Sequence, residues 1–94
     1  MAWGFISEIP ISPEQYDQLN AAIGEDPSGL ILHTASRTDG GMRIIDVWHS
    51  EADYRRFEQD HLTPAMGRLG WPPPDQPPPM ETFEVHNMRR PGAG

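Results

Sequence analysis

The 94-residue sequence contains no cysteine and no lysine. The absence of cysteine excludes a disulfide framework, a thiolate nucleophile and a zinc–thiolate site, and it makes a cytoplasmic location the expectation. The absence of lysine excludes Schiff-base chemistry and the lysine of a Walker-type phosphate loop. The four histidines are scattered, without the close spacing that metal ligands have. We therefore expect neither a metal ion nor another cofactor.

Long apolar runs and positive charge are also scarce. No stretch approaches the roughly 20 apolar residues that a membrane-spanning helix needs, so no membrane association is expected. Seven arginines stand against fourteen carboxylates, which gives a formal net charge of −7. Phosphate backbones repel a strongly acidic protein, so nucleic acid is not an expected partner either.

Proline and glycine are abundant, with 11 and 9 residues, and they gather towards the C-terminus. Six of the prolines fall in residues 71–79, which should form an extended, polyproline-like connector. Residues 91–94 should form a loose tail. The rest of the chain is typical of a single domain over residues 1–90, small enough that oligomerisation would add to its stability.

A β-hairpin is predicted at the centre of the chain. Two apolar runs, residues 30–32 and 44–48, flank Asp39-Gly40, a dipeptide typical of a two-residue loop in which both residues adopt positive φ. Counting outward from this loop pairs His33 with Asp46 across the hairpin. A three-residue loop would shift the register by one residue and break the pair.

The same count assigns the hairpin residues to two faces of a sheet, because residues that oppose each other point to the same side. It sets Ile31 against Trp48. One face should carry Leu30, Leu32, Thr34, Arg43, Ile45 and Val47, and the other Ile31, His33, Ala35, Ile44, Asp46 and Trp48. Both faces are therefore largely apolar, and the His–Asp pair lies on the face that also carries the tryptophan.

The first of two predicted helices lies before the hairpin. Ser12 and Gln15 have the spacing of a capping box, and Pro13 suits the first helical position, so the helix should begin there. Tyr16 belongs to its apolar stripe, and Gly24 should end it.

The second helix follows the hairpin and should begin after Ser50, with acidic residues in its first turn. One apolar stripe runs along four turns and consists of Tyr54, Phe57, His61, Ala65 and Leu69. Pro64 lies inside this helix and should kink it or split it after Leu62.

Strand-like segments at residues 2–9 and 80–88 complete the order strand, helix, strand, strand, helix, strand. This order predicts an α+β, ferredoxin-like fold: a four-stranded antiparallel sheet with two helices on one face. Two helices cover only one face, whereas the hairpin is apolar on both. A second copy of the sheet would cover the other face, so we expect a homodimeric α+β barrel.

The segment from Gly29 to Met66 resembles the small dimeric α+β-barrel proteins, in particular the antibiotic biosynthesis monooxygenase-like group. The hairpin, the Asp-x-Trp end of its second strand and the Ser-x-x-Asp start of the following helix carry this resemblance, together with the Phe and Leu positions of that helix. The resemblance implies a cofactor-independent enzyme acting on a hydrophobic, aromatic or polyketide-like small molecule, as a monooxygenase. A polyketide cyclase or isomerase of the same fold, or a non-catalytic small-molecule-binding or structural dimer, remains open.

The resemblance also implies a pocket between sheet and helices. Its tryptophan, tyrosine and arginine positions correspond to Trp48, Tyr54 and Arg68 here, whereas the polar amide of the group's third strand is replaced by Ile44. Tyr54 and Arg68 would hold substrate oxyanions, and Trp48 would pack on a substrate ring. Phe57 and His61 are further candidates for contact with the substrate.

His33 and Asp46 are the candidate base and its orienting carboxylate. A carboxylate beside an imidazole fixes the tautomer and stabilises the protonated form, which is what general-base catalysis requires. The alternative is a polar pair satisfied within the sheet, typically worth about 0.2–1 kcal/mol. With Tyr54, this pair makes up the predicted catalytic set.

Overall fold

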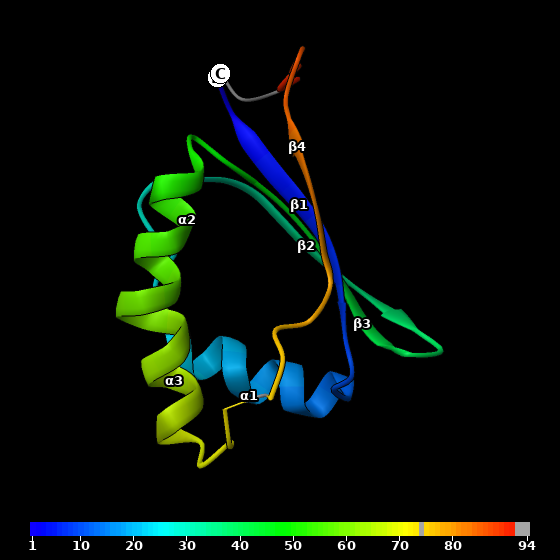
Figure 1. Cartoon of the computed structure of the whole chain (residues 1–94), viewed down its shortest axis with the longest axis vertical. Helices are drawn as coiled ribbons and strands as arrows, with labels where there is room; N and C mark the ends of the chain where they lie inside the picture. The colour runs from blue at the N-terminus through cyan, green and yellow to red at the C-terminus, as the bar shows by residue number, and fades with distance from the viewer. Residues whose placement is uncertain (74, 92–94) are drawn as a thin grey trace.

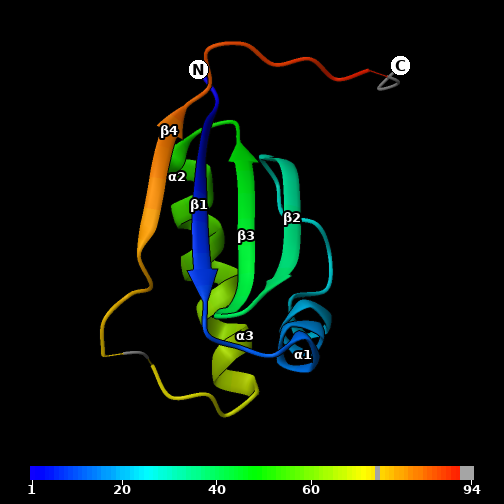
Figure 2. The same ribbon diagram turned by 90° about the vertical axis from the view of Figure 1, so that its right-hand side faces the viewer.

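The structure, a computed structural model, describes residues 1–73 and 75–91, and these residues form an antiparallel sheet of four strands in the order β2-β3-β1-β4. The elements are β1 (Trp3–Ile9), α1 (Pro13–Ile23), β2 (Leu30–Thr38), β3 (Gly41–Trp48), α2 (Glu51–Phe57), the π-helical turn η1 (Glu58–Leu62), α3 (Thr63–Arg68) and β4 (Met80–Glu84). All the helices lie on one face of the sheet (Figures 1 and 2). The predicted α+β, ferredoxin-like fold is confirmed.

The β2–β3 hairpin has the predicted register at its loop. Thr38 pairs with Gly41, and His33 pairs with Asp46. The conformation of the loop was predicted incorrectly: positive φ falls at Gly41, at 139°, and not at Asp39 or Gly40. A Cβ at Gly41 would collide with the carbonyl oxygen of Ile9, so this position requires glycine for both its backbone angle and its space.

A β-bulge at the start of β2 changes the predicted faces. Leu30, not Ile31, pairs with Trp48, and the regular register resumes where Leu32 pairs with Val47. Leu30 therefore packs against the buried core, whereas Ile31 lies with Leu32 and Val47 around a shallow cavity of about 280 Å³. The prediction was wrong for these two residues because one extra residue in a strand moves the side chains before it to the opposite face of the sheet.

Helix α1 begins and ends as predicted. The hydroxyl of Ser12 accepts a hydrogen bond from the backbone N–H of Gln15, and the backbone N–H of Ser12 donates to the side-chain oxygen of Gln15. Gly24 ends the helix with positive φ. These local contacts define the start and the end of α1.

The second helical stretch is divided near Pro64, as predicted. Helix α2 is capped by Ser50 and passes into η1, where the backbone N–H of Thr63 donates to the carbonyl of Glu58, five residues earlier. Helix α3 then begins at Thr63, with Pro64 in its first turn. The wider turn lets the chain continue through a residue that has no N–H to donate.

The core lies between the sheet and the helices. Its buried members are Trp3, Phe5, Met42, Ile44, Trp48 and Tyr54. Ile44, Asp46 and Trp48 all lie on this covered face, as the sequence predicts, while Ile45 and Val47 on the opposite face are only half-buried. No helix within the described ranges is long and apolar enough to cross a membrane.

The C-terminal part of the chain is less regular than predicted. Strand β4 ends at Glu84 and not at Met88, although the backbone N–H of Val85 still donates to the carbonyl of Ala2. Between Trp71 and Pro79, the described residues form no helix or strand. Pro74 lies outside the described residues, as do residues 92–94 of the predicted tail. A single domain over residues 1–90 stays a prediction.

Candidate functional site

Four side chains form a continuous hydrogen-bonded chain from α1 to β3. The Nδ1 atom of His33 lies 2.6 Å from Oδ1 of Asp46, and the hydroxyl of Tyr16 lies 2.6 Å from Nε2 of His33. The Nε1–H group of Trp48 donates to the other carboxylate oxygen, Oδ2 of Asp46, over 3.1 Å. We call this set, Tyr16–His33–Asp46–Trp48, the polar chain.

The hairpin and α1 each position part of the polar chain. The two-residue loop brings His33 opposite Asp46, and the alternation along β3 places Asp46 and Trp48 on the face that the helices cover. Tyr16 lies one turn into α1, and its ring is nearly parallel to the His33 ring, at 11°, with centroids 6.0 Å apart. The sequence had suggested only a core role for Tyr16.

The carboxylate of Asp46 is the anchor of the polar chain. It is buried, with 5% exposure, and both of its oxygens accept hydrogen bonds, one from His33 and one from Trp48. A buried carboxylate needs such partners, because an unpaired charge away from water is costly. The His33 side chain is 33% exposed, so the polar chain runs from the protein interior towards the surface.

The surroundings of His33 favour its protonated form. The hydrogen bond to Asp46 raises the pKa of His33 most, burial opposes it, and the charges of Asp46 and Asp26 raise it further. In the neutral ring, Nδ1–H donates to Asp46, which leaves Nε2 to accept the Tyr16 hydroxyl proton. Burial raises the pKa of Tyr16, and the charges of Asp46 and Asp17 add to this, so Tyr16 is a neutral phenol at physiological pH.

The predicted aromatic residues are packed against one another. Trp48 and Tyr54 are edge to face with centroids 5.5 Å apart, Phe57 lies 5.3 Å from Trp48, and His61 stacks on Phe57 at 6.0 Å. Trp48 is 1% exposed and Tyr54 5% exposed, so this stack fills the space between sheet and helices where the sequence suggested a pocket. Burial raises the pKa of Tyr54 strongly, so its phenol can donate a proton in a hydrogen bond but cannot act as a base near neutral pH.

Arg68, a predicted substrate-binding residue, contacts the end of α1. Its Nη2 group donates to the carbonyl oxygen of Ala22 over 2.8 Å, which ties α3 to the last turn of α1. The structure therefore brings His33, Asp46 and Trp48 together, and Trp48, Tyr54, Phe57 and His61 together, but it gives Arg68 a contact between helices.

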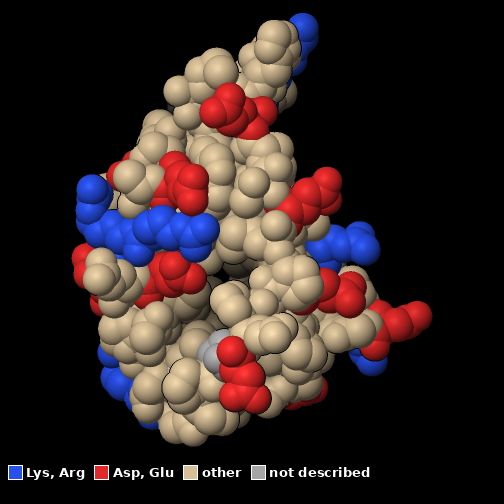
Figure 3. Space-filling model, viewed as in Figure 1, with Lys and Arg blue, Asp and Glu red and all other residues tan. Residues whose placement is uncertain are grey.

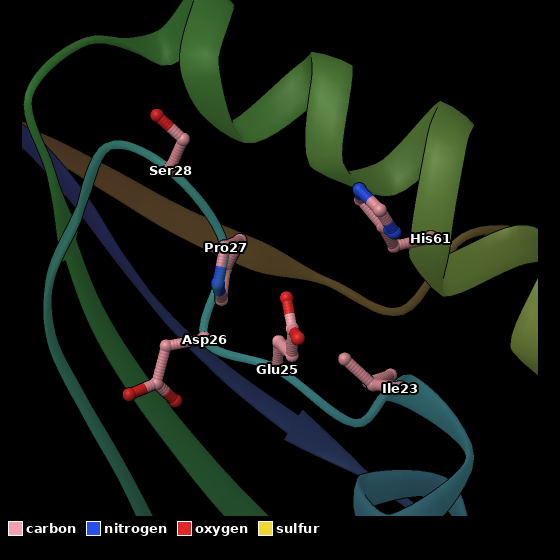
Figure 4. A pocket seen from close by; sticks show the side chains of 6 residues that line it. All are labelled: Ile23, Glu25, Asp26, Pro27, Ser28 and His61. Carbon is pink, nitrogen blue, oxygen red and sulfur yellow. The ribbon is translucent and has the colours of Figure 1, made fainter.

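A cavity of about 430 Å³ opens between the loop after α1 and the π-helical turn η1. Its walls consist of Ile23, Glu25, Asp26, Pro27, Ser28 and His61. Glu25 and His61 extend into it from opposite sides, whereas Asp26 is directed away from His61 (Figure 4). Neither His33 nor Tyr16 is among the residues that line this cavity. The volume suits a small organic molecule.

Within residues 1–73 and 75–91, no cluster of three or more histidines and carboxylates could hold a metal ion. Arginines over α2 lie among carboxylates (Figure 3): Arg55 pairs with Glu51 and Glu58, and Arg56 pairs with Asp53, all at 3.3 Å. Such exposed helix pairs contribute little to stability.

No protein-family model matches the chain, and neither does any curated protein sequence. Solved structures do resemble it. Rv0793 from Mycobacterium tuberculosis matches with a TM-score of 0.66 and 13% identity, over 96% of this chain and 100% of that one. A Chloroflexus aurantiacus protein, provisionally named an antibiotic biosynthesis monooxygenase, matches with a TM-score of 0.65 and 16% identity, over 96% and 98%.

A third structure has a named activity. SnoaB, a cofactor-independent oxygenase from Streptomyces nogalater, matches with a TM-score of 0.54 and 16% identity, over 93% of each chain. At such low identity, similarity extends to the arrangement of the backbone and not to substrate or reaction. The chain has the α+β fold of the antibiotic biosynthesis monooxygenase-like proteins, as its resemblance to them predicts.

Proposed function

We propose that the protein is a cofactor-independent monooxygenase that acts on a hydrophobic, aromatic or polyketide-like small molecule. The observation that carries this proposal is the hydrogen bond of 2.6 Å between His33 and the buried carboxylate of Asp46. A partly exposed imidazole held by a buried carboxylate has the arrangement of a general base. The fold supports the proposal because it is also the fold of SnoaB, a cofactor-independent oxygenase.

The proposed reaction begins with a proton transfer. An acidic C–H bond of the substrate breaks, its proton goes to His33, and Asp46 stabilises the imidazolium that forms. The carbanion transfers one electron to molecular oxygen, and the two radicals combine to a peroxide, which takes the proton back. Loss of water then leaves a carbonyl group, so that a CH₂ group and O₂ become a C=O group and water.

The 430 Å³ cavity is the proposed place for the part of the substrate remote from its reacting carbon, because neither His33 nor Tyr16 lines it. Its carboxylates would repel an anionic molecule, so a neutral, hydroxylated aromatic compound fits it better than an acid. His61 is the member of the predicted binding set that lines this cavity. Trp48, Tyr54 and Phe57 would contact a substrate only if their stack opened, and Arg68 would do so only if it released Ala22.

Anthrone, an aromatic carbon acid, is a suitable first probe. We expect oxygen uptake with formation of the quinone, and we expect His33→Ala to reduce the rate by about 100-fold or more, the contribution typical of a general base. His49→Ala is the matched control, because His49 is exposed and lies outside the polar chain. Equal rates in the two variants would contradict the proposed base. Turnover of a polyketide without oxygen uptake would instead favour a cyclase or isomerase.

A second candidate is a non-catalytic small-molecule-binding or structural dimer. The observation that favours it is the buried aromatic stack, in which Trp48, Tyr54 and Phe57 pack against one another where the family resemblance implies a pocket. Saturable binding of aromatic compounds without any chemical change, unaffected by His33→Ala, would support this candidate.

In either case we propose a homodimer. The face of the sheet away from the helices carries Leu32, which is 49% exposed, and the half-buried side chains of Ile6, Ile45 and Val47. An apolar face of this kind is usually covered by another molecule. A second copy would bury the same residues on both sides, as a two-fold interface does.

A further inference from the structure

We propose that Tyr16 is a catalytic residue, which carries the proton between the substrate and His33. This inference rests on the proposed function and adds a residue to it. The starting observation is that both nitrogens of the His33 ring already have partners: Asp46 at Nδ1 and the Tyr16 hydroxyl at Nε2, each at 2.6 Å. No ring nitrogen is left for direct contact with a substrate.

Tyr16 is held in this position by α1. The capping box of Ser12 and Gln15 fixes the start of the helix, and Leu19 is buried one turn further on. Arg68 ties the other end of α1 to α3 through the carbonyl of Ala22. The ring of Tyr16 also lies nearly parallel to that of His33. Because the whole helix is docked, the geometry favours a fixed relay over a side chain that must leave before each reaction.

A phenol is suited to relay a proton, because its oxygen can accept one hydrogen bond while its proton is donated in another. In the transfer, the proton of the substrate moves to the Tyr16 oxygen while the Tyr16 proton moves to Nε2 of His33. The products are the substrate anion and an imidazolium that faces Asp46, and Tyr16 is neutral before and after. Burial and the charges of Asp46 and Asp17 raise the pKa of Tyr16, which agrees with a phenol that never persists as an anion.

The rates of Tyr16→Phe and Tyr16→Ala with anthrone distinguish a relay from a lid. If Tyr16 relays the proton, both variants should lower kcat by about 100-fold or more, with KM changed by much less. If Tyr16 merely covers His33, Tyr16→Ala should expose Nε2 and match or exceed the wild-type rate, which would overturn the inference. Phenol added to Tyr16→Ala should restore part of the activity in a saturable manner, a result that a structural role does not explain.

The outcome separates this inference from the proposed function. Loss of activity in His33→Ala with full activity in Tyr16→Phe would overturn the relay and leave the base in place. Equal activity in wild type and His33→Ala, or no oxygen uptake by the wild type, would contradict the proposed function itself.

A second measurement requires no substrate. The Tyr16 hydroxyl proton should give a low-field proton NMR signal, which disappears in Tyr16→Phe and in His33→Ala but persists in His49→Ala. Absence of this signal from the wild type would overturn the contact, and with it the relay.

Discussion

At the scale of single residues, the central feature is the pair of short contacts to His33. Asp46 is buried and receives hydrogen bonds on both oxygens, so its position is determined by β2 and β3 together. His33 is closer to the surface. Its pKa is raised by Asp46 from β3 and Asp26 from the loop before β2, and Tyr16 from α1 contacts its second ring nitrogen. Titration of His33 therefore reports on the whole site.

Replacing Asp46 by asparagine should lower the pKa of His33. The hydrogen bond to Asp46 is the largest of the effects that raise this pKa, and an asparagine side chain carries no charge. The proposed base acts in its neutral form, so activity should increase as the pH rises through the pKa, and Asp46→Asn should move this rise to lower pH while reducing the maximal rate. The pH–rate profile and an NMR titration of the His33 ring would measure both effects.

The free energy of unfolding should also depend on the protonation of His33, but it should fall, and not rise, with increasing pH. Because the pKa of His33 is raised in the folded protein, charged His33 stabilises the fold fully below its ordinary pKa of about 6.5. This stabilisation is lost as the pH rises through the raised pKa. The free energy of unfolding of Asp46→Asn should therefore depend less on pH in this window than that of the wild type, and equal dependence would contradict the assignment.

At the scale of elements, the β2–β3 hairpin determines which residues meet. Its loop requires Gly41, where φ is 139° and a Cβ would collide with the Ile9 carbonyl. The bulge at Ile31 occurs beyond the His33–Asp46 pair, so it alters the strand end without disturbing the site. The same hairpin therefore combines a regular segment that holds the polar chain with an irregular end that redirects Leu30 into the core.

Gly41→Ala should destabilise the protein by more than about 1 kcal/mol, because alanine is strained at positive φ and has no room here. Gly67→Ala is the matched control: Gly67 lies in α3, and a Cβ there would meet no atom within 4 Å. Alanine at position 67 should stabilise the protein by about 0.5–1 kcal/mol. Urea denaturation would measure both, and equal effects would refute the structural distinction between the two glycines.

At the scale of the whole molecule, the distribution of apolar surface is unequal. One face of the sheet has α2 and α3 behind it and α1 at its lower end (Figure 2), whereas the other face leaves Leu32, Ile45 and Val47 partly exposed. For a chain of 10.6 kDa, burying this second face would add substantially to a small core. The proposed dimer follows from this asymmetry.

Ile45→Asp should convert the proposed dimer into monomer or aggregate, because an aspartate among the apolar side chains of this face, beside Ile6, would be desolvated without a partner. Gln18→Asp adds the same charge on the exposed side of α1 and should leave the dimer intact. Light scattering coupled to gel filtration at micromolar concentration would give the masses. A folded monomer of the unchanged chain would rule out the dimer.

The sequence by itself determined the features that depend on neighbours along the chain. The helix starts are marked by Ser12 with Gln15 and by Ser50, and the end of α1 is marked by Gly24. The second helical stretch is divided near Pro64. These signals can be read from the sequence because capping and the loss of an N–H act within one turn. The His33–Asp46 pair was also within reach, since alternation along two strands is regular once the loop between them is known.

Only the tertiary structure decided how these elements meet. The Tyr16 hydroxyl on α1 reaches the His33 ring on β2, a contact between residues 17 positions apart for which no local pattern exists. The bulge at Ile31 and the closed stack of Trp48 on Tyr54 likewise depend on how the strand end and α2 fit the core. Packing selects such contacts by shape and burial over the whole molecule, whereas a sequence pattern records only which residues favour a helix, a strand or a turn.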